Sequence, residues 1–148
     1  MREDLCAYVN GLRHEKNSAT YARKVANCSA YKRMTELLLR SKTVDPFFEM
    51  VGARKIAIYG VEGLGQIFGQ YVSKSNIHIE CYIDKNYQKY NQVNLDVIGI
   101  NEISNRDIDA IVISVLDAQC TIMKELVQNG FDLERIYTVN MVLYGISL

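Results

Sequence analysis

A glycine-rich turn in the middle of the chain carries the clearest chemical signal. The run IYGVEGLGQ, residues 58–66, follows an apolar segment and precedes an amphipathic one. A dinucleotide-binding turn, G-x-G-x-x-G, needs its first glycine for the tight turn, its second for backbone approach to a pyrophosphate and its third for close helix packing. Gly60 and Gly65 occupy the first and third positions. The run predicts a phosphate-binding loop made of Gly60, Val61, Glu62, Gly63, Leu64 and Gly65.

Glu62 departs from this pattern. It occupies the place of the second glycine, and Gly63 is displaced by one residue. A carboxylate there would crowd and repel a pyrophosphate at the N-terminus of the next helix. Either Gly63 reshapes the loop so that Glu62 turns away, or phosphate binding is lost. A third reading is that Gly60 and Gly65 only permit a tight strand–helix turn. We therefore expect binding of NAD or NADP to be weak or absent.

Asp84 supports a nucleotide site. It ends an apolar segment 19 residues after Gly65, where an acid in such folds accepts hydrogen bonds from an adenosine ribose. A carboxylate at this point favours NAD over NADP, because it would repel the extra phosphate. The alternative is that Asp84 begins a turn before Lys85. We expect Lys85 to belong to the cofactor-binding residues as well. Ser114 and Val115 close a later apolar segment, at the edge where a ligand would lie, and offer contacts and backbone amides.

Five apolar segments separated by helical patterns must position these residues. The expected strands are 55–59, 77–83, a short one near 96–98, 108–114 and 135–139. Strands at this spacing predict parallel βαβ units. We expect an α/β fold, a Rossmann-like parallel sheet of about five strands with flanking helices, preceded by an α-helical N-terminal arm.

Two helices of this sheet domain have recognisable inward faces. The first should bury Leu64, Ile67, Phe68 and Tyr71, and the second should bury Ile122, Met123, Leu126 and Val127. Asp117 is expected to cap the second helix, and Asn129 with Gly130 is expected to end it in a left-handed turn.

Residues 1–52 form the expected helical arm, and residues 53–148 the nucleotide-binding domain. The arm has an apolar stripe with helical spacing: Tyr21, Val25, Cys28, Tyr31, Met34, Leu37 and Leu38. The opposite face is basic, with Arg23, Lys24, Lys32, Arg33 and Arg40. Asp45 followed by Pro46 predicts a short helix, capped by Asp45 and ending at Gly52. The stripe should pack on the sheet domain or on a second copy, which would make a homodimer through the N-terminal helices.

Composition limits the class of protein. The chain has 148 residues, 49% of them hydrophobic and 23% charged, and one proline, which suits one domain with an arm and excludes a disordered chain. No apolar run is long enough to span a bilayer and no signal peptide is evident, so we expect a soluble, cytoplasmic protein. Formal net charge is zero, which makes a nucleic-acid partner unlikely by composition.

Groups for catalysis or metal binding are scarce. Four cysteines lack any C-x-x-C pair and only two histidines occur, so no zinc site is expected and the thiols should be reduced and mostly packed. His78 should be packed within a strand, His14 has no visible carboxylate partner, and Cys120 should be a small buried residue. We expect that the chain is not a complete enzyme on its own.

Five segments carry a family resemblance: KIAIYGVEGLGQ, IECYIDKN, LDVIGINEIS, DIDAIVISV and ELVQNGFDLERIY. They resemble the Rossmann-type N-terminal domain of membrane-associated nucleotide-sugar dehydratases and the related domain of sugar acyltransferases. The resemblance implies binding of a nucleotide, NAD(P) or a nucleotide-sugar, and assigns it to Gly60, Gly65 and Asp84. It implies an accessory or regulatory module of bacterial nucleotide-sugar or surface-polysaccharide metabolism.

Two other functions stay open at this point. The same segments resemble the NAD(H)-binding domain of bacterial redox-sensing repressors, although residues 1–54 are short for a winged helix. That reading predicts an NAD(H)-responsive transcriptional regulator that binds DNA through its basic helix. Glu62 also allows a degenerate Rossmann scaffold that serves only protein interactions.

Overall fold

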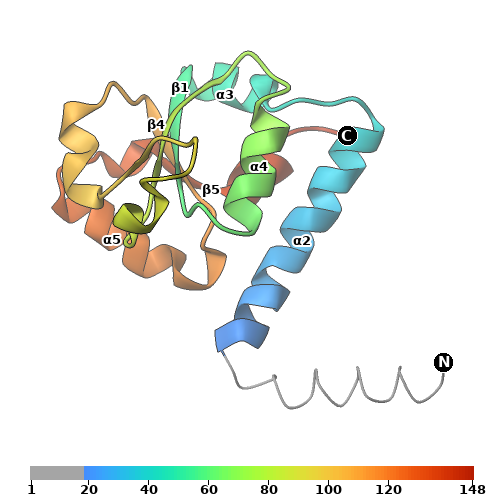
Figure 1. Ribbon diagram of the computed structural model, residues 1–148. Helices are drawn as coiled ribbons and strands as arrows, with labels where there is room; N and C mark the ends of the chain where they lie inside the picture. The colour runs from blue at the N-terminus through green and yellow to red at the C-terminus, as the bar shows by residue number, and fades with distance from the viewer. Residues whose placement is uncertain (1–18) are drawn as a thin grey trace, which may run out of the picture.

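The sheet confirms the α/β prediction. The computed structural model describes residues 19–148, and its five strands are all parallel, in the order β3-β2-β1-β4-β5 (Figure 1). The strands are β1 Lys55–Tyr59, β2 His78–Ile83, β3 Val97–Ile98, β4 Ala110–Ile113 and β5 Ile136–Thr138. This order is that of a Rossmann half-sheet with two further strands on one side. It places β1 at the centre, between β2 and β4, the strands that Asp84 and Ser114 directly follow.

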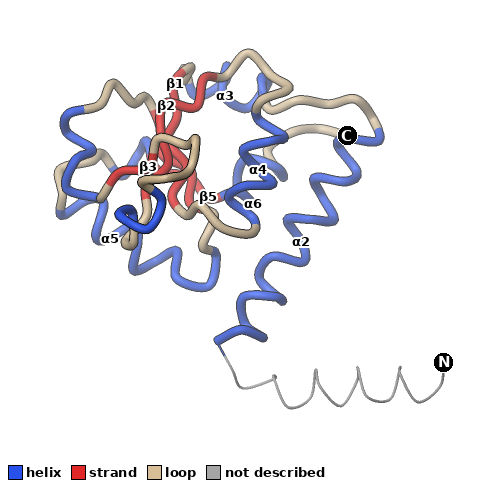
Figure 2. The backbone as a smooth tube through the Cα atoms, in the orientation of Figure 1, coloured by secondary structure: helices blue, strands red, loops and turns tan. Residues whose placement is uncertain are grey.

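Helices cover both faces of the sheet (Figure 2). The α-helices are α2 Ala19–Leu39, α3 Asp45–Val51, α4 Leu64–Val72, α5 Gln119–Gln128 and α6 Val139–Tyr144. Short 3-10 helices occur at η1 Tyr87–Tyr90, η2 Ile100–Asn105, η3 Leu116–Ala118 and η4 Leu133–Arg135. Alternate residues of β1 enter two separate cores: Ile56 and Ile58 join the core that includes α2 and α4, whereas Ala57 and Tyr59 join the core beneath α5. Both faces of β1 are therefore buried, as parallel sheets require.

Helix α2 packs on the sheet domain. Ala30, Met34 and Leu37 are buried in the same core as Ile58 and Phe68. The predicted stripe was partly wrong, because Val25, Cys28 and Leu38 are exposed. The buried face is rotated toward Ala30, whose small side chain is suited to close approach to the body of the protein. Association of two copies through this helix, and a domain boundary at residue 52, stay predictions.

Arg33 was expected on the exposed basic face of α2, and this was wrong. Its side chain is only 12% exposed, and its guanidinium donates to the carbonyl oxygens of Leu143 at 3.2 Å and Ile146 at 2.7 Å. These carbonyls lie at the end of α6 and just beyond it, where a helix leaves acceptors unsatisfied. Arg33 thus fastens α2 to the C-terminal segment.

The two predicted aspartate caps were also wrong. Helix α3 begins at Asp45, and its N-cap residue is Val44. The Asp45 carboxylate instead accepts from the Thr43 hydroxyl at 2.7 Å and from the Asn76 amide at 2.9 Å. Asp117 lies inside η3, one residue before the Ala118 N-cap of α5. Both carboxylates contact residues of other elements, and neither caps a helix.

The helix ends and inward faces agree better with expectation. Gly52 and Gly130 have left-handed φ angles of 71° and 88°, which confirms both predicted helix stops. The exceptions are Ile67 and Val127, each 44% exposed. None of the helices in residues 19–148 has both the length and the apolarity needed to cross a membrane.

Asp109 joins the amino ends of β1 and β4, and its loss should destabilise the fold. Its Oδ2 accepts from the amides of Arg54 and Lys55, both at 2.8 Å, and these bonds lower the pKa of the carboxyl. We expect Asp109→Ala to lower the free energy of unfolding by about 2 kcal/mol at pH 7. Urea denaturation measures this change.

The pH dependence of that effect follows from the lowered pKa of Asp109. Its stabilisation is fully present above about pH 4, the usual aspartate pKa, and is lost as the pH falls through the lower folded-state value. The difference between the two proteins should therefore shrink in acid. The control is Asp107→Ala, since that exposed carboxylate pairs only with the Lys55 side chain among the described contacts. An equal loss in both variants would contradict the role of Asp109.

Candidate functional site

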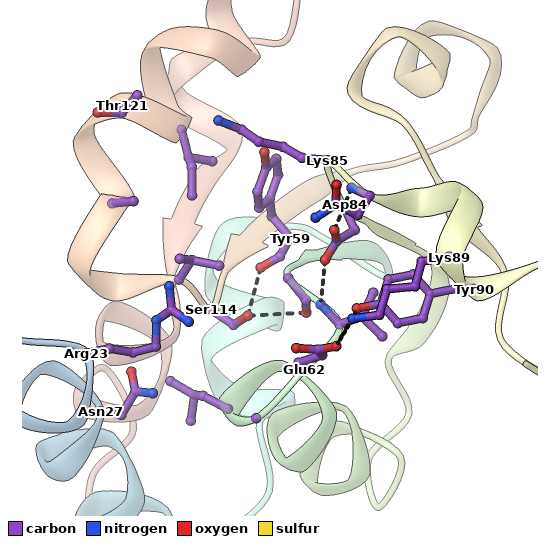
Figure 3. Close-up of a pocket in the computed structure, with 18 residues that line it drawn as sticks. Arg23, Asn27, Tyr59, Glu62, Asp84, Lys85, Lys89, Tyr90, Ser114 and Thr121 are labelled. Atoms are coloured by element: carbon purple, nitrogen blue, oxygen red, sulfur yellow. Dashed lines mark hydrogen bonds and ion pairs between the residues drawn. The ribbon is translucent and has the colours of Figure 1, made fainter. Parts of the chain in front are cut away.

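A cavity of about 510 Å³ opens at the carboxyl edge of β1, β2 and β4 (Figure 3). Its wall comes from the loops that follow these three strands, from the start of α5 and from α2. Nine of the predicted site residues line it: Gly60, Val61, Glu62, Gly63, Leu64, Asp84, Lys85, Ser114 and Val115. The fold therefore brings together residues that were singled out at three separate places in the sequence.

The glycine turn is shaped by close backbone contacts. Gly60 has a φ of 99°, and a Cβ there would lie 2.5 Å from Ser114 Oγ. A Cβ on Gly65 would lie 1.9 Å from the Gly60 carbonyl oxygen. Gly65 does not line the cavity; it lets α4 start directly against β1, as expected for the third glycine. The Ser114 hydroxyl donates to the Tyr59 carbonyl at 2.8 Å and so ties β4 to this turn.

Asp84 both begins a turn and faces the glycine loop. Its Oδ1 accepts from the Asn86 amide at 2.8 Å, which is the local turn considered in the sequence. Its Oδ2 lies 3.5 Å from the Val61 amide nitrogen. The carboxylate is thus held between the end of β2 and the turn after β1. The neighbouring Lys85 reaches across to Glu125 Oε1 at 3.2 Å.

The carboxylate of Glu62 is paired. Its Oε1 accepts from Lys89 Nζ at 2.8 Å and from the Tyr90 hydroxyl at 3.1 Å (Figure 3). The hydrogen bond from Lys89, with a smaller contribution from Tyr90, lowers the pKa of Glu62. The group is therefore an anion at neutral pH, and it is held toward η1. The side chain stays 69% exposed, so solvent screens its charge.

Nine of the residues that line the cavity were missed in the sequence, and Arg23, Asn27, Tyr59, Lys89 and Tyr90 are among them. Lys89 and Tyr90 lie in a Tyr- and Asn-rich loop that has no periodic pattern. Arg23 and Asn27 lie on α2, and nothing local indicates that this helix reaches the site. Tyr59 is the last residue of β1, and its position at the end of a buried strand is a signal that could have identified it. Burial raises the pKa of its hydroxyl to about 12, so it keeps its proton at neutral pH.

The histidine and cysteine predictions were partly wrong. His78 begins β2, is 67% exposed and lies 3.5 Å from Glu80, so it is not a packed strand residue. Cys28 and Cys120 are exposed, and only Cys81 of the described cysteines is buried. Burial raises the Cys81 pKa to about 12, so it stays a thiol. None of these four residues lines the cavity; His14 and Cys6 lie outside the described residues.

The cavity carries charges of both signs. Three cations, Arg23, Lys85 and Lys89, face it together with two anions, Glu62 and Asp84. Arg23 lies 3.6 Å from Asp117, a contact that joins α2 to η3. Across residues 19–148 no group of three or more His, Cys, Asp or Glu side chains could hold a metal ion. The wall offers hydrogen bonds and charges of both signs.

Comparisons with known proteins identify a family. A search of curated proteins found no match to the chain. A family model described as C2185-like, N-terminal, matches residues 52–137, which is more than half of the chain. The match begins at the end of α3 and includes all of β1 to α5. The chain therefore belongs to the C2185-like family.

Proposed function

We propose that the cavity binds a nucleotide, either NAD(P) or a nucleotide-sugar. One observation carries the proposal: the glycine turn, the N-terminus of α4 and Asp84 meet in a single cavity at the carboxyl edge of a Rossmann-ordered sheet. Ligands of open α/β sheets bind at this edge, at the point where the strand order reverses. The volume of about 510 Å³ falls within the range of small-molecule sites.

The ligand would lie across the ends of three strands. Its phosphates would approach the N-terminus of α4 beside Gly63, where backbone amides and the helix dipole favour an anion. Its ribose would donate hydrogen bonds to Asp84. Lys85 and Lys89 would offset the negative charge of the phosphates.

The proposed role is that of an accessory or regulatory module in bacterial nucleotide-sugar or surface-polysaccharide metabolism. The support is the resemblance of the five quoted segments to domains attached to enzymes of that metabolism. A thermal-shift screen against NAD(H), NADP(H), coenzyme A, UDP-sugars and CDP-sugars tests the proposal. A ligand that binds only the folded state must raise the apparent melting temperature. No shift with any of these compounds at millimolar concentration would overturn it.

Asp84 should set the choice between NAD and NADP. We expect Asp84→Ala to weaken NAD binding by about 1–3 kcal/mol, the effect of losing hydrogen bonds to a charged acceptor. NADP affinity should fall less, because the repulsion of its extra phosphate disappears at the same time. Isothermal titration calorimetry with both cofactors measures the difference between the NAD and NADP affinities.

The control for this experiment is Asp107→Ala, which removes the same charge at the amino edge of the sheet, beside Lys55. It should leave both affinities within about twofold of those of the unmodified protein. Equal affinity of the unmodified protein for NAD and NADP would contradict the role given to Asp84.

A further inference from the structure

Three buried side-chain polar atoms in residues 19–148 have no hydrogen-bond partner: Asn27 Oδ1, the Tyr59 hydroxyl and Asn140 Oδ1. Such groups are rare in folded proteins, because each loses its hydrogen bonds to water without replacement. Asn27 and Tyr59 both line the cavity, whereas Asn140 does not. Two of the three unpaired groups are thus concentrated in the candidate site.

Asn27 is the less expected of the two, because it belongs to the N-terminal helix. Its exposed fraction is 9%, and its side chain lies at the end of the cavity beside Arg23 (Figure 3). This end lies on the β4 side, since α2 contacts η3, the turn that follows β4. Asp84 directly follows β2, on the other side of the central strand. The cavity therefore runs from Asp84 across the glycine turn to Asn27.

The rest of α2 holds Asn27 in place. Over the next two turns of the helix, Ala30 and Met34 are buried in the core, and Arg33 is bonded to two carbonyls of the C-terminal segment. The contact between Arg23 and Asp117 fastens the preceding turn to η3. An amide that is buried, unpaired and rigidly placed is preorganised to bind a ligand.

We infer that Asn27 binds the second polar group of a two-part ligand, in which phosphates join a nucleoside to a carboxamide or a sugar. This rests on the proposed function. The nucleoside and phosphates occupy the cavity from Asp84 to the N-terminus of α4, and the remaining volume on the β4 side receives the group beyond the phosphates. Its N–H or O–H donates to Asn27 Oδ1. Helix α2 is thus a specificity-determining part of the site, in addition to its packing role.

The test compares complete and half ligands on the full chain. Calorimetry measures the affinities of NAD, AMP, UDP-glucose and UMP for the unmodified protein and for Asn27→Leu, whose side chain has the same number of heavy atoms and no polar atom. We expect the variant to bind the two-part ligands about tenfold more weakly and the mononucleotides within twofold. A selective loss for NAD over AMP would identify the second group as the carboxamide part. A selective loss for UDP-glucose over UMP would identify it as the sugar.

Asn140→Leu is the matched control. It removes another amide with a buried, unpaired oxygen, on α6 and outside the cavity. Although its nitrogen donates to Ser29 Oγ at 3.3 Å, the change should leave all four affinities unchanged. In the absence of ligand, Asn27→Leu should melt at the same temperature as the unmodified protein or higher, because no bond made by the oxygen is lost.

Two results would overturn the inference while the proposed function stands. The first is that nucleotides bind, but Asn27→Leu does not weaken two-part ligands more than mononucleotides. This holds whether both ligand types lose affinity equally or neither does. The second is a clear fall in the melting temperature of ligand-free Asn27→Leu, which would give the amide a purely structural role. Absence of binding by all four ligands would overturn this inference, and the proposed function would fall with it only if no compound of the thermal-shift screen binds either.

Discussion

Replacing Gly65 with alanine is expected to lower the free energy of unfolding by about 3 kcal/mol, the upper range for overpacking. The added Cβ would lie 1.9 Å from the Gly60 carbonyl oxygen and 2.7 Å from Ser114 Oγ. The first of these atoms is backbone, so relief requires α4 to move away from β1. Because α4 supplies Phe68 and Tyr71 to the core, that movement costs packing as well. Urea denaturation followed by circular dichroism measures the loss.

The expected loss of stability is opposite in sign to the change that helix propensity alone would predict for a glycine-to-alanine substitution. An alanine that met no steric obstacle would stabilise an α-helix by about 1 kcal/mol relative to glycine. The control is Gly52→Ala, where the Cβ meets nothing within 4 Å but φ is 71°. That change should cost about 1–2 kcal/mol, from the left-handed backbone alone. A Gly65→Ala protein as stable as the unmodified one would show that the turn does not require the close approach.

Glu62→Gln is expected to tighten the binding of pyrophosphate ligands by at least tenfold. The carboxylate lines the cavity beside Gly63, where the phosphates would lie. Two like charges about 4 Å apart repel by roughly 4 kcal/mol at an effective dielectric near 20. The exposure of Glu62 and its ion pair with Lys89 reduce this repulsion. A residual effect of about 1.4 kcal/mol is a factor of ten in affinity.

Glutamine keeps the shape of the side chain and an oxygen that can accept from Lys89 and Tyr90. The variant therefore tests charge rather than loop geometry. Calorimetry with NAD at low and moderate salt measures the effect, which should be larger at low salt. Because Lys89 lowers the pKa of Glu62, the carboxylate stays charged across the neutral range, and the gain should not depend on pH there.

Two further variants complete the experiment on Glu62. Glu49→Gln removes the same charge from an exposed position on α3, outside the cavity wall, and should leave the affinity unchanged. Lys89→Gln leaves the Glu62 carboxylate without its cation and should weaken binding. Tight NAD binding by the unmodified protein, unaltered in Glu62→Gln, would mean that the phosphates lie away from this carboxylate.

Much of the fold was predictable because its signals are local. The bounds expected for β1 match the structure, since an apolar, β-branched run followed by a required glycine specifies a buried strand. The turn between β1 and α4 was also predictable, because Gly60 and Gly65 mark a backbone path that a Cβ would obstruct. The two aspartate caps were not, since distant residues compete for the same carboxylates. Asn76, for example, lies 31 positions after Asp45.

The sequence by itself determined the type of each element and the residues at the ends of three neighbouring strands. Periodicity, turn residues and glycine positions depend on the backbone of a few adjacent residues, so they can be recognised without a structure. Only the tertiary structure decided which groups join them in the cavity. Lys89 reaches Glu62 across 27 positions, and Asn27 reaches the site because Arg33 bonds a carbonyl 113 positions away. Such contacts depend on how packed elements lie against one another, and no pattern within a single element contains that information.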